Sequence, residues 1–306
     1  MILHQNRSDR FSQVKLLNGK MIMRNKLSEK LMQIIFMLSA AVSVLAVVLI
    51  CYFLFDQGLP AMVEVGVADF LSGTVWKPLE GHFGIFPMII GSIYVTAGAI
   101  IVGVPVGLLC AVYMAKFCPP SVYRIMKPAV DLLAGIPSIV YGFFALMVIV
   151  PVMQTLTGTS GKGILTASIM LGIMILPTII SVSESSIRAV PESYYEGSLA
   201  LGATHERSVF FATLPAAKSG IMAGVILGVG RAIGETMAVS MVAGNQPIIP
   251  QSITSGVRTM TANIILEMGY AGEGLHRGAL IATAVVLFVF ILIINISFSL
   301  LKRGNK

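Results

Sequence analysis

One arginine and one glutamate interrupt an otherwise apolar part of the sequence. Arg231 and Glu235 lie four residues apart in the segment GVILGVGRAIGETMAV, so on one helix they would share a face and reach each other. A guanidinium directs two N–H donors toward an oxyanion, whereas the carboxylate repels an anion unless it is paired or protonated. Two interpretations follow. Either the pair lies beside a solute path, where an arriving anion releases Arg231 from Glu235, or it is a neutralised pair that only fixes helix packing.

A polar, helix-forming segment, EGSLALGATHERSVFFATLP at residues 196–215, lies between two apolar segments. Its turn and cap residues predict a helix–turn–helix hairpin over residues 191–215. These residues are Pro191 at a first helical position, Leu201 at the end of the first helix, Gly202 in a left-handed turn, Thr204 as the next cap, and Leu214 with Pro215 as the final stop. The apolar residues of the hairpin predict either a docking surface for a partner or packing against the chain's own helices. They are Leu199, Leu201, Val209, Phe210 and Phe211.

The elements that position these residues are membrane-spanning helices. The 306 residues are 56% hydrophobic and 11% charged, with a mean hydropathy of +0.88, which is typical of a protein embedded in lipid. Residues 31–55 contain no Lys, Arg, Asp or Glu, and about 20 apolar residues suffice to cross a bilayer as a helix. Pro105 and Pro137, with the glycines around them, predict kinked and tightly packed helices. We therefore expect an all-α membrane protein whose six spans are residues 31–55, 88–115, 132–153, 164–183, 221–243 and 278–301.

Positive charge predicts the orientation of these spans. Sixteen Lys and Arg residues fall in the amino-terminal arm, the second and fourth connections and the tail, and four fall in the opposite loops. Because positive loops are retained in the cytoplasm, both termini and the hairpin are expected there. The net charge of +7 then reflects topology, and no basic face suited to nucleic acid is found. The first apolar run exceeds a signal-peptide core of about 7–15 residues, so we expect a retained anchor.

The sequence contains no motif that would make the chain an enzyme. Gly161 and Lys162 resemble part of a phosphate-binding loop, but Leu156 stands where its first glycine is needed. The four histidines have no metal-binding spacing, no G-x-S-x-G segment occurs, and the three cysteines form no C-x-x-C pair. We expect no catalytic residue, metal site or cofactor in this chain, with an intramembrane hydrolase as the enzymatic alternative.

The hairpin resembles the coupling segment of ABC importer permeases, whose pattern is E-A-A, three residues, G, nine residues, I-x-L-P. The glutamate, glycine and Leu-Pro keep this spacing, whereas Gly197 and Ser198 replace the two alanines and Ala212 replaces the isoleucine. The resemblance implies a six-helix type I ABC importer permease of the MetI-like class, whose hairpin enters a groove of an ATP-hydrolysing subunit. It assigns this coupling to Glu196, Gly197, Ser198, Gly202, Leu214 and Pro215.

Two further segments resemble phosphate-specific importers. They are DLLAGIPSIVYG at residues 131–142 and GRAIGETMAVSMVAGN at residues 230–245. The second segment is more similar to the C-type phosphate permease than to the A-type, which differs after the shared Gly-Glu-Thr. In this family the residues that correspond to Arg231 and Glu235 are implicated in phosphate passage, so the resemblance favours the solute-path interpretation.

The resemblance also implies partners and a location, the cytoplasmic (inner) membrane of a bacterium. An A-type phosphate permease would form a heterodimer with this chain, two ATP-binding subunits would hold ATP and Mg²⁺, and an extracytoplasmic binding protein would deliver phosphate. Phosphate-sensing regulators and membrane lipid are further expected partners, and nucleic acid is not expected. The expected organisation is a cytoplasmic basic arm at residues 1–30, a first transmembrane helix at 31–55, and a permease domain at 83–301 that contains the hairpin.

Three alternatives remain at the level of sequence. An A-type phosphate permease is the first alternative, although the residues after the shared Gly-Glu-Thr resemble the C-type. A buried arginine accepts many anions, so sulfate or molybdate is an alternative solute. A regulatory membrane scaffold for phosphate sensing is the third alternative, and it belongs to a different functional class.

Overall fold

The computed structural model describes residues 2–303, with side chains described for residues 29–297 and Leu300. Within these residues, six helices are long and apolar enough to cross a membrane, as the sequence predicts. They are Glu29–Val65, Phe86–Phe117, Ser138–Thr157, Ile164–Arg188, His205–Gly234 and Leu275–Ser297. The chain divides into two units, residues 1–56 and 57–306. The side chains of most of the predicted basic arm and of the basic tail lie outside the described residues.

The first unit is a single helix. Helix α1, Ile2–Val65, continues through the predicted arm and the first predicted span and ends in the second unit. The side chains of residues 31–50 are all exposed. An apolar helix without a polar face is what a lipid environment requires, because lipid tails solvate such side chains and water does not.

Three long helices form the centre of the second unit. They are α3 (Phe86–Val112), α7 (Ile164–Arg188) and α10 (Leu214–Gly234), and α7 packs against both of the others. Apolar side chains of α7 such as Met174 and Ile175 are fully buried. Gly103 of α3 lies so close to α7 that a Cβ there would be 2.8 Å from the carbonyl oxygen of Gly172. Helices in lipid associate through such close packing, since small residues let the backbones approach.

The third predicted span is interrupted at its start. Helix α4 covers Pro120–Gly135, and the span proper begins at α5 (Ser138–Phe144), continues through the π-helical turn η3 (Ala145–Ile149) and ends with α6 (Val150–Thr157). The prediction of one helix over 132–153 is therefore wrong at its first residues. Pro137 explains the break, because proline lacks an N–H donor and disfavours helical backbone at the residue before it.

The fifth predicted span, residues 221–243, is also interrupted. Helix α10 ends at Gly234, Glu235 has extended backbone with ψ 130°, and the short helix α11 covers Met237–Val242. The side chain of Glu235 accepts a hydrogen bond from the backbone N–H of Ala238 (3.1 Å) and so satisfies a donor at the start of α11. Arg231 and Glu235 thus do not share one helix.

The connections at one end of the second unit carry short elements rather than a folded domain. They are α2 (Val67–Ser72), the antiparallel strands β1 (Trp76–Lys77) and β2 (His82–Phe83) joined by η1 (Pro78–Glu80), and α12 (Met260–Met268), which precedes α13 (Leu275–Arg303). Glu267 of α12 accepts hydrogen bonds from Trp76 Nε1 (2.8 Å) and Arg258 Nη1 (2.6 Å). The bond from Trp76 connects segments that are 191 positions apart in the sequence.

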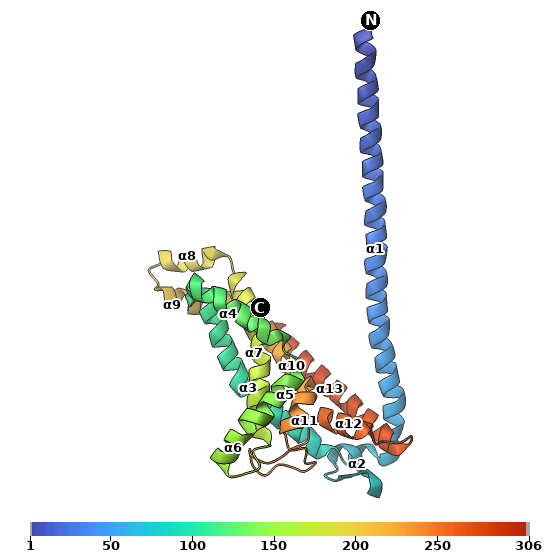
Figure 1. The fold of residues 1–306 in the computed structure, drawn as a ribbon, viewed down its shortest axis with the longest axis vertical. Coiled ribbons are helices and arrows are strands. Elements are labelled where there is room, and N and C mark those ends of the chain that lie inside the picture. Colours follow the sequence, from blue (N-terminus) through green and yellow to red (C-terminus); the bar gives the residue numbers. More distant parts are fainter. Residues whose placement is uncertain (1, 304–306) are drawn as a thin grey trace. The chain divides into compact units, whose positions relative to one another are not determined.

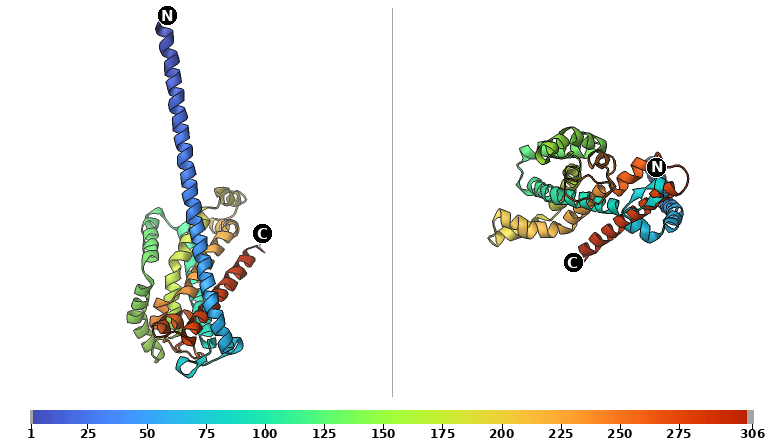
Figure 2. Two further views of the ribbon diagram at one scale, coloured as in Figure 1. Left: turned by 90° about the vertical axis from the view of Figure 1, so that its right-hand side faces the viewer. Right: turned by 90° about the horizontal axis from the view of Figure 1, so that it is seen from below.

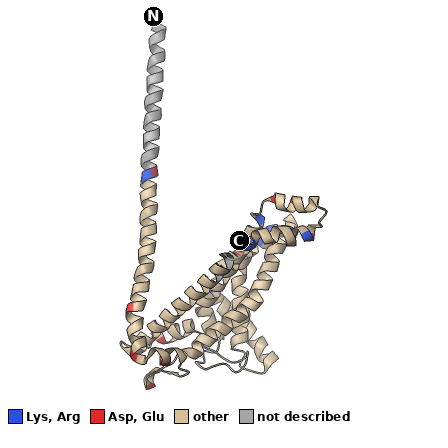
Figure 3. Ribbon diagram, turned by 180° about the vertical axis from the view of Figure 1, so that it is seen from behind, with Lys and Arg blue, Asp and Glu red and all other residues tan. Residues whose placement is uncertain are grey.

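The predicted hairpin lies at the opposite end of the second unit. It consists of α8 (Glu192–Ala200) and α9 (His205–Ser208), followed by the π-helical turn η4 (Val209–Thr213) that leads into α10. Figure 1 shows α8 and α9 at one end and α2 and α6 at the other, and Figure 2 shows the long helices running between these ends. Lys and Arg of the second unit gather at the hairpin end, as Figure 3 shows. Positive charge of the second unit is therefore enriched at the hairpin end.

Candidate functional site

The turn of the hairpin forms as its sequence predicts. Gly202 has the left-handed backbone conformation, with φ +85°, which glycine adopts without steric cost. Thr204 caps α9, because its Oγ1 accepts a hydrogen bond from the backbone N–H of Arg207 (3.3 Å). The first helix ends at Ala200, one residue before the predicted end, and Pro191 directly precedes it.

Side chains hold the two arms of the hairpin together. Ser198 Oγ accepts a hydrogen bond from Ser208 Oγ (3.1 Å), and Tyr195 Oη lies 2.7 Å from His205 Nδ1. Ser198 stands where the importer pattern has alanine, so this departure from the pattern adds a bond between the arms. Figure 1 shows the two arms side by side.

The second helix of the hairpin does not end at Leu214 and Pro215, contrary to the prediction. A continuous helical segment runs from His205 to Gly234, and Pro215 lies in the first turn of α10. The π-helical turn η4 directly precedes this proline. A widened turn accommodates the missing N–H of a proline and relieves the clash of its ring with the preceding turn. The hairpin is therefore joined rigidly to the fifth span.

The apolar residues of the hairpin divide between the two predicted roles. Leu201 is 91% exposed and Phe211 is 78% exposed, whereas Val209 is fully buried against the chain's own helices. Phe210 and Leu199 are partly exposed. Of the coupling residues that the resemblance assigns, Glu196, Gly197, Gly202 and Pro215 are exposed, and Ser198 and Leu214 are partly buried. The tip of the hairpin thus presents large apolar side chains to its surroundings.

Arg231 and Glu235, the two predicted solute-path residues, lie near each other in sequence but have separate partners. Arg231 Nη1 lies 3.4 Å from Thr178 Oγ1 of α7. The backbone carbonyl of Glu235 accepts a hydrogen bond from Thr261 Oγ1 (3.0 Å), while its side chain caps α11. Among the described side chains no ion pair joins the two, so the predicted Arg–Glu pair is wrong for this structure. The helix break at Glu235 is the physical reason.

The two helix breaks lie close together. Helix α5, which follows the break at Pro137, packs on α11, which follows the break at Glu235. A Cβ on Gly142 of α5 would be 2.7 Å from the Cα of Ala238. The hydroxyl of Tyr141 donates a hydrogen bond to the carbonyl of Leu133 (2.8 Å) across the first break. Irregular backbone inside a membrane is tolerated where it is buried in protein or lines a water-filled cavity, and here the elements that follow the two breaks pack on each other.

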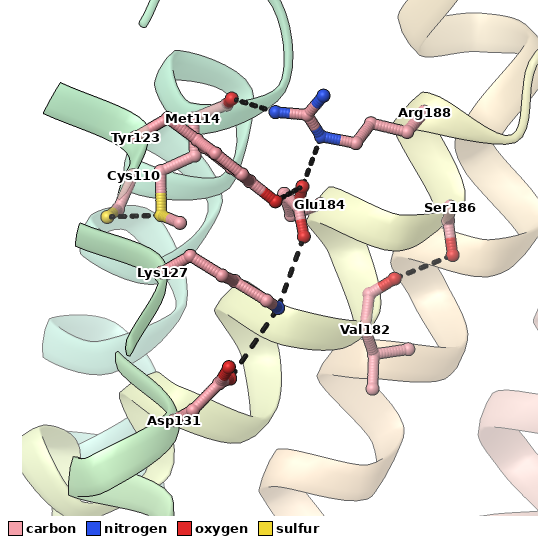
Figure 4. Close-up of polar contacts among 9 residues, drawn as sticks. All are labelled: Cys110, Met114, Tyr123, Lys127, Asp131, Val182, Glu184, Ser186 and Arg188. Atoms are coloured by element: carbon pink, nitrogen blue, oxygen red, sulfur yellow. Dashed lines mark hydrogen bonds and ion pairs between the residues drawn. The ribbon is translucent and has the colours of Figure 1, made fainter. Parts of the chain in front are cut away.

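A second polar cluster was not predicted from the sequence. Glu184 on α7 is buried, with a side chain only 2% exposed, and it is surrounded by Tyr123, Lys127 and Asp131 of α4 and by Arg188 of α7 (Figure 4). We refer to these five residues as the Glu184 cluster. Burial, and then the hydrogen bond to Glu184, raise the pKa of Tyr123 above its ordinary value, so its hydroxyl stays a donor.

Two signals for the Glu184 cluster are present in the sequence. Glu184 and Arg188 are four residues apart, as are Lys127 and Asp131, and such pairs face each other on a helix. The hydropathy pattern predicts that the fourth span ends at residue 183, and Lys127 and Arg188 count there only toward the orientation of the spans. The sequence does not reveal the contact between α4 and α7, which brings Lys127 close to Glu184, 57 positions away.

No group of three or more His, Cys, Asp or Glu residues among the described side chains is arranged to hold a metal ion. Cys51, Cys110 and Cys118 carry free thiols. The Glu184 cluster pairs its carboxylates with cations rather than presenting several of them to a common point.

Known proteins match most of the chain. Residues 103–306, more than half of the chain, match the family described as binding-protein-dependent transport system inner membrane component. A Bacillus subtilis protein named probable ABC transporter permease protein YqgH is 37% identical over 84% of this chain and 86% of its own. The phosphate transport system permease protein PstC of Mesorhizobium japonicum is 35% identical over 74% of this chain and 75% of its own.

Solved structures show the same fold at lower identity. A permease chain of the MetNI methionine ABC transporter in an inward-facing conformation has a TM-score of 0.57 at 19% identity, over 76% of this chain and 100% of its own. A chain of a bacterial ABC transporter for the polysaccharide alginate has a TM-score of 0.59 at 13% identity, over 87% of this chain and 95% of its own. The similarity to these two structures is one of fold, that is, of the arrangement of the helices.

Proposed function

The chain belongs to the family of binding-protein-dependent transport system inner membrane components, and we propose that it is the membrane-spanning permease subunit of an ATP-driven importer of inorganic phosphate. The observation that carries the choice of phosphate is the similarity to permeases named for phosphate transport, which covers about three quarters of the chain or more. The chain is a multi-pass inner-membrane transport permease and not an enzyme. Its solute would cross by alternating access between the two faces of the membrane.

The proposed solute path runs beside the two helix breaks. Discontinuous helices form the solute sites of many transporters, because their unwound ends expose backbone groups at membrane depth. Arg231 supplies positive charge there, with Thr178 as its neighbour at 3.4 Å. Phosphate would engage the free donors of the guanidinium, while Glu235 holds the start of α11 in place. An importer needs weak binding at such a point so that the solute can leave.

The hairpin is proposed to dock on an ATP-binding subunit. ATP and Mg²⁺ would bind in that subunit, since this sequence has no complete phosphate-binding loop. Leu201 and Phe211 are the exposed apolar anchors, and the continuous helix from His205 to Gly234 leads from the docking surface to Arg231. The gathering of Lys and Arg of the second unit at this end supports a cytoplasmic hairpin. From the distribution of Lys and Arg along the sequence we propose that both termini are cytoplasmic as well.

The remaining partners follow from the family. Membership implies ATPase subunits and a solute-binding protein. We propose that two copies of the ATPase serve a heterodimer of this chain with an A-type phosphate permease, and that the binding protein carries phosphate to the face opposite the hairpin. Phosphate-sensing regulators are proposed as further partners of the assembled complex.

Copurification followed by transport tests this function. The complex that copurifies with a tagged chain is identified by mass spectrometry and reconstituted into vesicles with the binding protein. We expect ATP-dependent uptake of labelled phosphate that excess sulfate or molybdate does not displace. If sulfate or molybdate displaces phosphate, that anion is the solute. If deletion of the chain alters phosphate signalling while phosphate uptake stays intact, the chain acts as a regulatory scaffold.

A further inference from the structure

The Glu184 cluster connects two helices through a buried carboxylate. Glu184 accepts a hydrogen bond from Tyr123 Oη (2.9 Å) and forms ion pairs with Lys127 Nζ (3.4 Å) and with Arg188 Nε. Lys127 also lies 3.5 Å from Asp131. The Arg188 guanidinium stacks over the Tyr123 ring at 4.3 Å. Tyr123, Lys127 and Arg188 each contact Glu184, and Asp131 contacts Lys127 (Figure 4).

The cluster lies at the base of the hairpin. Arg188 is the last residue of α7, and α8 begins only four residues later at Glu192. Arg188 Nη2 also donates to the carbonyl of Met114 (2.8 Å), in the π-helical turn η2 (Tyr113–Phe117) at the end of α3. From the same turn Lys116 reaches Glu192 at 3.4 Å. The hairpin is thus linked to the ends of α7 and α3 as well as to α10, into which it continues.

The cluster is also the polar attachment of α4. Among the helices, α4 makes its main contact with α7, and residues on its other side are exposed, such as Ile125 at 74% and Leu132 at 73%. Three contacts of the cluster tie α4 to α7, namely the hydrogen bond from Tyr123 to Glu184, the ion pair of Lys127 with Glu184 and the stacking of Arg188 on the Tyr123 ring. At its far end α4 reaches the break at Pro137, where Tyr141 bonds to the Leu133 carbonyl.

These contacts form one connected route from the hairpin to the solute path. The route runs from α8 through the end of α7 to α4, then across the first helix break to α5, which packs on α11 beside the second break. Apolar side chains that leave a helix contact in lipid still meet an apolar medium, because lipid tails are as apolar as the side chains. A buried carboxylate held by two cations has no such alternative, since separation from them leaves an uncompensated charge.

From this route, and resting on the proposed function above, we propose that Glu184 is a positioning residue. It fastens α4 to the base of the hairpin, so that hairpin movement driven by the ATP-binding subunit shifts α4 and the two helix breaks together. Glu184 touches neither Arg231 nor the exposed tip of the hairpin. Its role is to transmit displacement, not to bind phosphate or the ATPase.

A distance measurement tests the transmission without any solute. Spin labels at Leu132 on α4 and at the exposed Ser193 on α8 of the hairpin are attached in the complex of this chain with its copurified partners, in a background where the three cysteines are replaced. In the wild type we expect ATP binding to change this distance by less than about 2 Å, because α4 follows the hairpin. In Glu184→Gln we expect a larger change. An equal response of wild type and variant would overturn the proposal.

Coupling is measured on the same complexes in vesicles. We expect Glu184→Gln to lower the phosphate moved per ATP hydrolysed by about tenfold, because charged hydrogen bonds are lost, while ATP hydrolysis stays within about twofold. Glu80→Gln is the matched control, since it removes an exposed ion pair with Lys77 at the opposite end, and it should leave the ratio unchanged. A wild-type ratio in Glu184→Gln would refute the proposal. Absence of phosphate uptake in the wild type would instead refute the proposed function, and the distance measurement would still decide the role of Glu184.

A double variant separates transmission from folding. Glu184→Gln leaves Lys127 with Asp131 as its carboxylate partner but leaves Arg188 with none among the described side chains, and this cost can reduce the amount of folded complex. Glu184→Gln combined with Arg188→Gln removes the cation that has lost its carboxylate, so the abundance of the complex should recover. We expect the ratio of phosphate to ATP to stay low in the double variant. Recovery of both abundance and ratio would show that Glu184 serves folding only.

Discussion

The exposed phenylalanine of the hairpin provides a quantitative prediction about ATPase docking. Phe211 is 78% exposed. Complete burial of such a side chain contributes about 1.5–3 kcal/mol, so covering the exposed part in a groove of the ATPase contributes roughly 1–2 kcal/mol. A difference of about 1.4 kcal/mol corresponds to about tenfold in affinity. We therefore expect Phe211→Ala to weaken binding of the ATP-binding subunit by about 5- to 30-fold.

The assay titrates the ATP-binding subunit onto the permease pair held in nanodiscs and follows binding by interferometry. Leu79→Ala is the matched control, because Leu79 is equally apolar and fully exposed but lies in η1, at the end opposite the hairpin. Its affinity should equal that of the wild type. Binding of Phe211→Ala within about twofold of the wild type, or an equal loss in Leu79→Ala, would refute the assignment of the hairpin tip as the docking surface.

Three further predictions concern the solute path and the hairpin. Gly142→Val should disrupt the packing of α5 on α11, because even a Cβ would be 2.7 Å from the Ala238 Cα. We expect the complex to lose about 1–3 kcal/mol of stability. An unchanged thermal midpoint of the purified complex would contradict this prediction. Arg231→Gln should lower phosphate uptake at matched abundance by about tenfold or more, whereas Arg231→Lys keeps the charge and should retain more activity. Equal uptake by the wild type and Arg231→Gln would contradict the proposal that Arg231 lies on the solute path. Ser198→Ala should remove the 3.1 Å bond to Ser208 and increase amide exchange in α8 by about 2- to 10-fold, and identical exchange would show that the bond does not hold the arms together.

The parts of the fold that depend on local composition could be predicted from the sequence. A charge-free window such as residues 31–55 identifies a span because charge in lipid is costly whatever the neighbouring helices are. The turn at Gly202 and the cap at Thr204 were predicted for a similar reason, since each depends on the conformational preference of one residue.

The helix break at Glu235 could not be predicted in this way. A hydropathy window over residues 221–243 averages across one extended residue, and the break is stabilised by a side-chain cap on Ala238 and a bond from Thr261, which is distant in sequence. Spacing alone therefore suggested an Arg231–Glu235 pair that the structure does not contain. At Pro215 the sequence predicts the end of a helix, but the π-helical turn before it allows the helix to continue.

The Glu184 cluster illustrates a further limit of sequence reasoning. Each half of it, Lys127 with Asp131 and Glu184 with Arg188, reads as an ordinary pair on a helix surface. Only the packing of α4 on α7 buries Glu184 and converts two surface pairs into a link between helices. Such contacts depend on which helices become neighbours, and the windows that predict the spans contain no information about neighbours.

The most direct test of the central claim is solute transport by the reconstituted complex. Vesicles that contain this chain, its copurified permease and ATPase partners, and the binding protein are supplied with labelled phosphate and with ATP on the hairpin side. We expect saturable phosphate uptake that requires ATP, persists in excess sulfate or molybdate, and falls in Arg231→Gln. Uptake that is absent in the wild-type complex, or that another oxyanion abolishes, would contradict the assignment as a phosphate importer permease.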